Sequence, residues 1–250
     1  NFRLLTQSNR GIAGARNRGL REAMGRYLMF LDSDDFLPEN AVQSLLYAAV
    51  YRNADIVQGS FRYLDQSGSK ILGLEKYENK GSVAPNGVLS GMAWGKVFRA
   101  ELWQQVCFPE GYWYEDSLLS LLVFSMAKNI WVSSQMCYSY RINQEGIVKS
   151  SKGKPRAVET YWITEELLEE RKQLGLPMDS RFFQFLLLQL RLNQLRLSDL
   201  DEKIQESAFV ISCDLLQKYF EPGVMRGKEK NLIKALKNRD FGMFRMCCRF

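Results

Sequence analysis

A short apolar run that ends in an acidic cluster is the feature of this sequence that most limits its fold. Residues 27–31 are all apolar or aromatic, and Asp32-Ser33-Asp34-Asp35 follows directly. Five such residues in a row predict a strand that is buried on both faces. In open α/β sheets, ligands bind outside the carboxyl ends of the strands. We therefore expect an α/β sheet whose site lies at this cluster.

The spacing of the acidic residues favours a metal site. Carboxylates at i and i+2, such as Asp32 and Asp34, can converge on one hard cation such as Mg²⁺ or Mn²⁺. The alternative is that Asp34 or Asp35 caps a helix that begins near Pro38. A cap needs only one carboxylate, and three acidic residues in four positions repel one another unless a cation lies among them.

Periodicity and turn signals along the chain predict an α/β body followed by helices. Helices are expected at 15–24, at 38–51 and after Glu115-Asp116. Strands are expected at 56–57 and 61–63 with a hairpin return at 70–72, and as a final pair at 131–132 and 137–140. Residues 75–91 are predicted to form a loop. Helices are then expected up to Gly175, from Asp179 and from Asp201, so the predicted division is 1–150 and 151–250.

Two features of the composition narrow the chemistry. The 250 residues include no histidine, which removes Ser-His-Asp triads, Cys-His dyads and His-ligated zinc. Acid-base chemistry must therefore come from Asp, Glu, Lys, Tyr or Cys. The five cysteines are odd in number and have no C-x-x-C spacing, so we expect no disulfide framework or cysteine metal site, and a reducing compartment fits.

The net charge of +6 lies at the C-terminal end. Residues 226–250 carry eight Lys or Arg and two acidic residues, so the rest of the chain is balanced. Apolar residues alternate with the basic ones there, at Leu232, Ile233, Leu236, Phe241, Met243, Phe244, Met246 and Phe250. A basic amphipathic segment is suited to an anionic membrane surface; the alternative is a terminal helix that packs its apolar side on the body. A charged tail without a broad basic stripe argues against a nucleic-acid partner.

The acidic cluster belongs to an ordered series of motifs. Asn9-x-Gly11-x-x-x-Ala15-Arg16-Asn17-x-Gly19 and Ala23-x-Gly25 precede it, and Trp94-x-Lys96-x-Phe98-Arg99, Phe108-Pro109-Glu110-Gly111, Tyr114-Glu115-Asp116 and Tyr138-x-Tyr140-Arg141 follow it. The series resembles the GT-A glycosyltransferases of family 2 over residues 1–150. The resemblance implies a GT-A mixed sheet with helices on both faces, followed by a C-terminal helical region.

The resemblance also implies a reaction and roles for the matching residues. The reaction would be an inverting transfer of a sugar from a nucleotide diphosphate to an acceptor hydroxyl. Asp32 and Asp34 would hold the divalent cation, Mn²⁺ or Mg²⁺, and Asp116 would be the general base. The expected donor-binding residues are Asn9, Arg16, Asp32, Asp34 and Lys149, and the expected acceptor-side residues are Trp94, Lys96, Tyr114 and Glu115.

Each of these roles has a structural alternative. Arg16 and Lys149 would otherwise be solvated surface residues, and Glu115 and Asp116 would be helix caps. Large aromatic residues such as Trp94 and Tyr114 belong to a core more often than to a sugar platform.

The sequence departs from the family pattern in two places. It begins after the strand, turn and helix that carry an acidic nucleoside-binding pair in relatives, so we expect the chain as printed to lack part of its donor pocket and to be inactive or poorly folded alone. Where relatives often have a histidine after the Tyr-x-Tyr-Arg block, this chain has Val148-Lys149-Ser150.

The expected partners follow from the same resemblance. They are a UDP-sugar as donor, and as acceptor a bacterial surface polysaccharide or lipid-linked glycan, with the protein in the cytoplasm at the inner face of the membrane. Two alternatives stay open: a haloacid-dehalogenase-like phosphatase with Asp32 as nucleophile, and a degenerate glycosyltransferase-like binding module.

Overall fold

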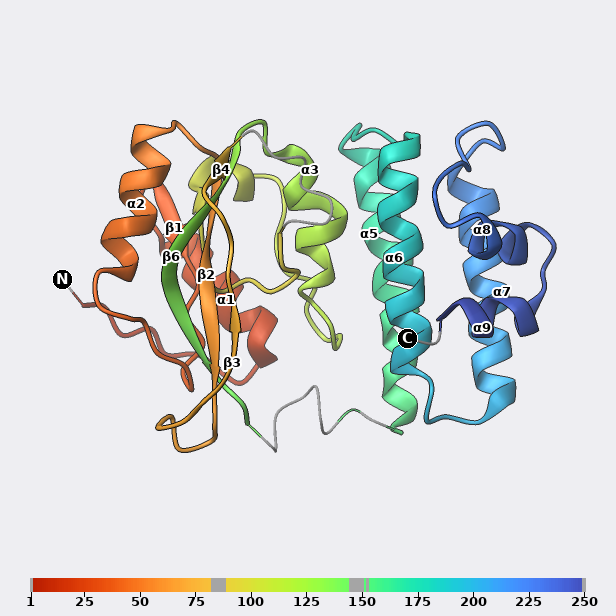
Figure 1. Cartoon of the computed structure of the whole chain (residues 1–250), viewed down its shortest axis with the longest axis horizontal. Helices are drawn as coiled ribbons and strands as arrows, with labels where there is room; N and C mark the ends of the chain where they lie inside the picture. Colours follow the sequence, from red (N-terminus) through yellow and green to blue (C-terminus); the bar gives the residue numbers. More distant parts are fainter. Residues whose placement is uncertain (1, 82–88, 144–150, 152, 249–250) are drawn as a thin grey trace. The chain divides into compact units, whose positions relative to one another are not determined.

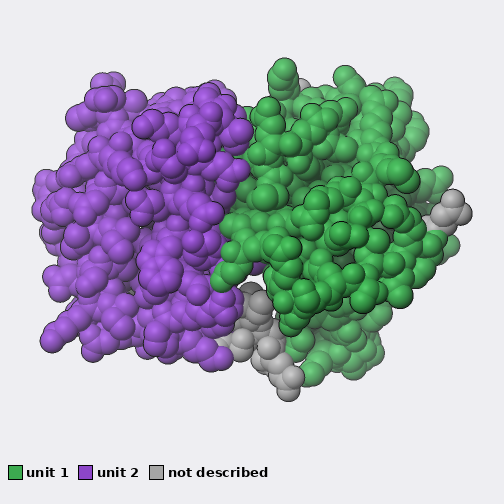
Figure 2. All heavy atoms as spheres, turned by 180° about the vertical axis from the view of Figure 1, so that it is seen from behind, with its two compact units in different colours: residues 1–111, 118–146 green, residues 112–117, 147–250 purple. Residues whose placement is uncertain are grey.

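The computed structural model describes residues 2–81, 89–143, 151 and 153–248, and the chain divides into two compact units (Figures 1 and 2). Unit 1 comprises residues 1–111 and 118–146, and unit 2 comprises residues 112–117 and 147–250. The division near residue 150 that the sequence predicts falls at the edge of residues 144–150, which lie outside the described residues.

Unit 1 is built around one mixed sheet with helices on both sides (Figure 1). The strand order is β1-β5-β2-β6-β4, and β3 pairs with β2. β2 runs parallel to β6 and antiparallel to β5 and β3. In chain order the elements are α1 (Gly11–Glu22), β1 (Tyr27–Met29), α2 (Ala41–Tyr51), β2 (Ile56–Leu64), β3 (Ile71–Glu75), β4 (Lys80–Gly81), β5 (Lys96–Arg99), η1 (Ala100–Trp103), η2 (Leu119–Val123), α3 (Phe124–Met126) and β6 (Ile130–Arg141). The predicted α/β class is confirmed.

The core of unit 1 lies between α2 and the sheet. Ala41, Leu45 and Ala49 recur every four residues, so they share one face of α2, and all three are buried. They pack with Val57 of β2, Val97 of β5 and Cys137 of β6. A Cβ at position 59 would collide with the Cys137 side chain, so only glycine allows β2 and β6 to approach here.

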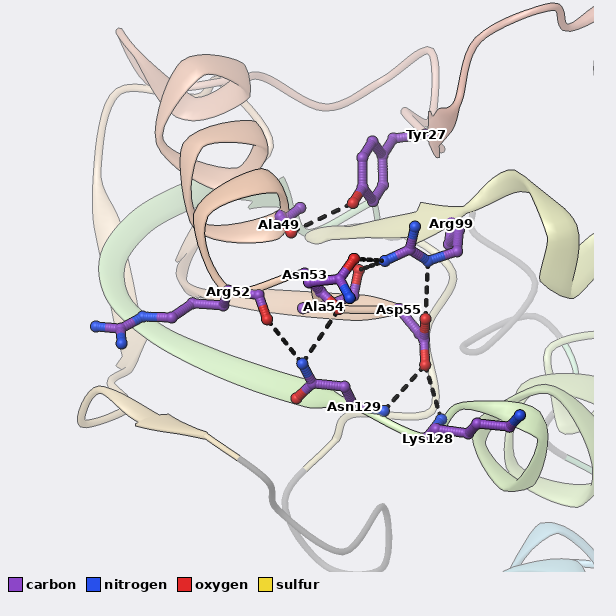
Figure 3. A network of polar contacts seen from close by, with 9 residues as sticks. All are labelled: Tyr27, Ala49, Arg52, Asn53, Ala54, Asp55, Arg99, Lys128 and Asn129. Carbon is purple, nitrogen blue, oxygen red and sulfur yellow. Dashed lines mark hydrogen bonds and ion pairs between the residues drawn. The ribbon is translucent and has the colours of Figure 1, made fainter.

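A polar network ties three strands together at one end of the sheet (Figure 3). The Asp55 carboxylate accepts hydrogen bonds from Arg99 Nε at 2.8 Å and from the backbone N–H groups of Lys128 and Asn129 at 2.8 and 2.9 Å. Burial opposes ionisation, but these donors outweigh it and lower the pKa of Asp55. The start of β2, the end of β5 and the approach to β6 therefore meet at one carboxylate.

Several predicted strands and helix ends differ from the structure. β1 is half-buried rather than buried on both faces, because within the described sheet it is an edge strand that pairs with β5 alone. α2 begins at Ala41 rather than Pro38, whose carbonyl instead accepts the Ala41 N–H in a turn. The predicted final strand pair is a single strand, β6, whose pairing with β2 shifts register near Gly59 and Ser60.

The expected loop 75–91 differs as well: Glu75 ends β3, residues 80–81 form the two-residue strand β4, and residues 82–88 lie outside the described residues. The hairpin from β2 into β3 is as predicted.

Unit 2 is helical. It contains η3 (Pro155–Val158), α5 (Glu159–Gln173), α6 (Ser180–Arg196), α7 (Glu202–Tyr219), α8 (Lys230–Lys237) and α9 (Phe241–Cys248). The predicted starts at Asp179 and Asp201 are confirmed: both carboxylates accept a backbone N–H of the first helical turn, from Phe182 and Lys203 respectively. Across the described residues, none of the helices has the length and apolar character needed to cross a membrane.

The C-terminal segment packs its apolar side within unit 2. Leu232, Ile233 and Leu236 of α8 and Phe244 of α9 are buried, and the Phe244 ring lies 4.8 Å from that of Phe209 in α7. The packing alternative therefore describes these four residues, while Phe241 and Met243 are half-buried, Met246 is exposed and Phe250 lies outside the described residues.

Candidate active site

The acidic loop begins where β1 ends. Phe30 forms a bridge with Trp94, and the chain then turns so that the Asp35 N–H donates to the Asp32 carbonyl at 3.1 Å. Asp32 and Asp34 are half-buried, and Asp35 is buried. The loop thus presents two partly accessible carboxylates above a third that points into the protein.

β6 holds the acidic loop through side chains and backbone. Tyr138 Oη donates to Asp35 Oδ2 at 2.7 Å and accepts the Asp32 N–H at 3.2 Å. The Arg141 N–H donates to Asp35 Oδ1 at 2.8 Å, and Arg141 Nε donates to the Asp34 carbonyl at 2.7 Å. Every residue of the acidic loop except Ser33 is therefore bonded to one strand. We call Asp35, Tyr138 and Arg141 the loop clamp.

The burial of Asp35 has an electrostatic consequence. Burial raises the pKa of Asp35 to about 6, although the bonds from Arg141 and Tyr138 lower it; the charges of Asp34 and Asp32 raise it further. Burial together with the neighbouring carboxylates also raises the pKa of Tyr138 far above its usual value, so Tyr138 remains a hydrogen-bond donor. The loop clamp was missed by the sequence reasoning, although Tyr138 and Arg141 stood in a recognised motif.

Residues of α1 approach the loop from the other side. Arg16 Nη2 lies 3.0 Å from Asp32 Oδ1, and its side chain is 8% exposed. Its guanidinium also lies over the Phe108 ring, at 5.2 Å from the centroid. Arg16 is therefore a buried partner of Asp32, and its surface-residue alternative is wrong. Asn9, in contrast, is exposed and accepts the Gly11 N–H at 2.9 Å at the start of α1.

The acidic pair fits a divalent cation in its donor chemistry. Carboxylate oxygens are the ligands that Mg²⁺ and Mn²⁺ prefer, and Mg²⁺ sites often use one or two carboxylates together with substrate phosphates. Within the described residues, no group of three or more His, Cys, Asp or Glu side chains is arranged to hold a metal ion. The two carboxylates of Asp32 and Asp34 have the donor chemistry that a divalent cation requires.

Two predicted acceptor-side residues lie in the interior of unit 1. Trp94 is 4% exposed, and its ring stacks on those of Tyr138 and Tyr140 at 4.5 and 5.2 Å. Lys96 is fully buried, and its Nζ donates to Ser90 Oγ at 2.6 Å and to the Met92 carbonyl at 2.8 Å. Trp94 supports β6 beneath the loop clamp, and Lys96 orders residues 90–94.

The other predicted acceptor-side residues belong to unit 2 together with the predicted base. Glu115 is buried, Asp116 is half-buried, and Tyr114 has a φ of 68° in the left-handed region. The Arg196 guanidinium lies 3.8 Å from the Tyr114 ring centroid and donates to Thr160 Oγ1 at 2.6 Å. Burial lowers the pKa of Arg196 to about 10, while Tyr114, Asp116 and Glu115 raise it. Arg196 is a charged neighbour of the predicted base that no sequence signal indicated.

The structure therefore brings together part of the predicted site. Arg16 pairs with Asp32 in unit 1, where Asp34 belongs to the same acidic loop, and Tyr114, Glu115 and Asp116 lie together in unit 2. Lys149 lies outside the described residues.

The mixed sheet with an acidic loop after β1 defines the class of protein. The fold is similar to that of S. aureus TarS residues 1–349, solved in complex with UDP-GlcNAc, with a TM-score of 0.70 and 18% identity over 97% of this chain and 72% of that one. The class is the GT-A fold. Residues 1–102 match the model of glycosyl transferase family 2.

The curated relatives of this chain are also glycosyltransferases. Glycosyltransferase GlyA of Streptococcus pneumoniae is 31% identical over 157 residues, which are 56% of this chain and 22% of GlyA. Glycosyltransferase GlyG of the same organism is 26% identical over 164 residues, which are 59% of this chain and 54% of GlyG. The chain thus spans about a fifth and about half of the lengths of these two relatives. The haloacid-dehalogenase alternative is not favoured.

Proposed function

We propose that this chain is the catalytic part of a glycosyltransferase that moves a sugar from a nucleotide diphosphate to an acceptor hydroxyl with inversion. The observation that carries the proposal is the clamped acidic loop: Asp32 and Asp34 follow β1 of a GT-A sheet, and Tyr138 and Arg141 bind their backbone. A loop with a fixed backbone suits a ligand that must be oriented before it reacts.

The donor side of the proposed reaction uses residues of unit 1. Asp32 and Asp34 would hold Mn²⁺ or Mg²⁺, which supplies neutralisation of the charge that develops on the leaving nucleotide diphosphate. Arg16 is held against Asp32, so its guanidinium is already oriented, and we assign it to the diphosphate, which it can bind with two parallel hydrogen bonds. The TarS structures in complex with UDP-GlcNAc and with UDP support a UDP-sugar as donor. Asn9 and Lys149 keep their proposed donor-side roles.

The acceptor side of the proposed reaction needs a base. As the acceptor oxygen bonds to the anomeric carbon, the bond from that carbon to the diphosphate oxygen breaks and its electron pair leaves with the diphosphate. The proton of the acceptor hydroxyl passes to the carboxylate of Asp116. Tyr114 and Glu115 flank this group, and Arg196 balances its charge.

The acceptor and the location complete the proposal. We propose a bacterial surface polysaccharide or a lipid-linked glycan as acceptor, and the cytoplasmic face of the membrane as the place of reaction. The basic residues of 226–250 support contact with an anionic membrane. Because Leu232, Ile233, Leu236 and Phe244 of this segment are buried, such contact would be mainly electrostatic.

The test is a donor screen of the full-length gene product with Mn²⁺. Release of nucleotide diphosphate from one UDP- or GDP-sugar, lost on removing the metal and in Asp34→Ala, is the expected result. A protein that binds UDP but releases none from any donor, with or without a glycan acceptor, would be a binding module instead.

A further inference from the structure

Four basic side chains of unit 2 surround one pocket. Lys230, Lys234 and Lys237 follow one another at intervals of four and three residues, so they lie on the same face of α8. With Arg226 they line a pocket of about 370 Å³. Met225 and Ile233 contribute apolar surface to the same pocket. The pocket thus combines several positive charges with an apolar part.

The charges around this pocket differ from those of Arg239 and Arg245 in the same segment. Arg239 pairs with Asp214, and Arg245 pairs with Glu202. Among the described residues, Arg226, Lys230, Lys234 and Lys237 form no ion pair, and no carboxylate lines the pocket. Four unneutralised cations close together repel one another, so an anion among them would be stabilised.

The backbone of the pocket is held by unit 2 itself. The Arg226 carbonyl accepts a hydrogen bond from Gln184 Nε2 of α6, and the Arg226 N–H donates to the Val224 carbonyl at 2.7 Å. α8 is anchored by buried Leu232, Ala235 and Leu236. The backbone that carries the four basic side chains is therefore held in place by contacts within unit 2.

We propose that this pocket binds the phosphate headgroup of an anionic phospholipid. The four cations would surround the phosphate, and Met225 and Ile233 would contact the carbons next to it. A mixed lining of this kind suits an amphiphile better than a fully hydrophilic phosphate such as a sugar phosphate. The inference rests on the membrane contact of the proposed function and assigns it to one site and one ligand chemistry.

The test compares two charge-matched variants of the full chain in vesicle sedimentation. Lys230→Gln/Lys234→Gln removes two cations of the pocket, and Lys172→Gln/Lys203→Gln removes two exposed cations elsewhere on unit 2. We expect the first pair to weaken partitioning onto phosphatidylglycerol-containing vesicles by about 30-fold, equivalent to about 2 kcal/mol. The second pair should leave partitioning within about twofold of the wild type.

Three outcomes would overturn the inference. Equal losses in the two variants would show a diffuse charge effect rather than a site. Equal binding to phosphatidylcholine vesicles would show that the headgroup charge is not recognised. Release of the wild type from phosphatidylglycerol vesicles by millimolar glycerol phosphate would assign the pocket to a soluble phosphate.

The result is independent of the sugar chemistry. UDP binding with Mn²⁺, measured by calorimetry on the same variants, reports the donor site and should be unchanged in both. A wild-type protein that does not bind the vesicles would contradict the proposed membrane contact itself. A wild-type protein that binds the vesicles but not UDP would contradict the proposed sugar transfer and still support the lipid site.

Discussion

The hydroxyl of Tyr138 joins two residues of the acidic loop: it donates to the Asp35 carboxylate at 2.7 Å and accepts the backbone N–H of Asp32 at 3.2 Å. One oxygen atom on β6 therefore fixes both ends of the loop that carries the proposed metal ligands. Asp35 acts as the inward anchor of this loop, which explains why a third acidic residue stands beside the Asp32 and Asp34 pair.

Tyr138→Phe should separate this anchoring from packing. The substitution keeps the ring that stacks on Trp94 and removes only the hydroxyl. We expect the free energy of unfolding to fall by about 1–3 kcal/mol, because the buried Asp35 carboxylate loses a donor. Calorimetric UDP binding with Mn²⁺ should weaken by about tenfold as the loop loosens.

The matched control is Tyr140→Phe. Tyr140 also stacks on Trp94, but among the described residues its hydroxyl makes no hydrogen bond. Near wild-type UDP binding in both variants would contradict the anchoring role of Tyr138.

Asp34→Ala tests the metal assignment. Loss of a residue that only hydrogen-bonds to a metal ligand typically weakens metal binding by about 10- to 100-fold. Asp34→Ala removes a ligand together with its charge, so it should weaken Mn²⁺-dependent UDP binding by more than this. Glu39→Ala, an exposed acidic residue in the same region, should have no effect. Calorimetry with and without Mn²⁺ decides the matter, and unchanged binding in Asp34→Ala would remove Asp34 from the metal site.

Asp116→Asn tests the general base. The amide keeps the shape of the carboxylate but cannot accept the acceptor proton, so transfer should fall by about 10²- to 10⁴-fold while donor binding persists. Glu115→Gln, one residue away, serves as the control and should reduce transfer far less. Transfer by Asp116→Asn near the wild-type rate at saturating donor would leave Asp116 as a helix cap.

Asp55→Asn tests the network at the strand ends. The pKa of Asp55 is lowered from 3.8 in the folded protein, so its ionised form stabilises the fold above about pH 4, and this stabilisation is lost as the pH falls through the lower folded pKa. Asparagine cannot accept all three N–H donors, so the free energy of unfolding at pH 7 should fall by about 1–3 kcal/mol.

The measurement for Asp55→Asn is urea unfolding from pH 7 to pH 3. The loss should shrink as the pH falls below about 3.8, because the unfolded wild-type chain then takes up a proton that the folded Asp55 carboxylate resists. A loss that is constant over this range would show that the carboxylate acts only through its shape.

Local signals in the sequence predicted the helix starts and the hairpin, which depend on residues close together in the chain. The starts of α6 and α7 were predicted because Asp179 and Asp201 cap their own helices. The hairpin of β2 and β3 was predicted because Asp65 organises its own turn by accepting the Ser69 and Lys70 N–H groups.

Contacts between distant residues could not be predicted in this way. The roles of Trp94 and Lys96 depend on Tyr138 and on residues 90–94 surrounding them, and no local pattern distinguishes a buried tryptophan from an exposed sugar platform. β6 was divided in two because Ser133, Ser134 and Gln135 interrupt its apolar pattern, whereas its parallel pairing with β2 continues through an irregularity there.

The six residues 112–117 are synthesised well before the rest of unit 2. They belong to unit 2, but they leave the ribosome before residues 118–146 of unit 1 and before any helix of unit 2. The Trp113 N–H finds the Glu159 carboxylate only when α5 has emerged, and the Tyr114 ring finds Arg196 only when α6 is complete. A nascent chain that stops before Arg196 therefore contains Asp116 but not yet the helix residue that contacts the nearby Tyr114 in the complete chain.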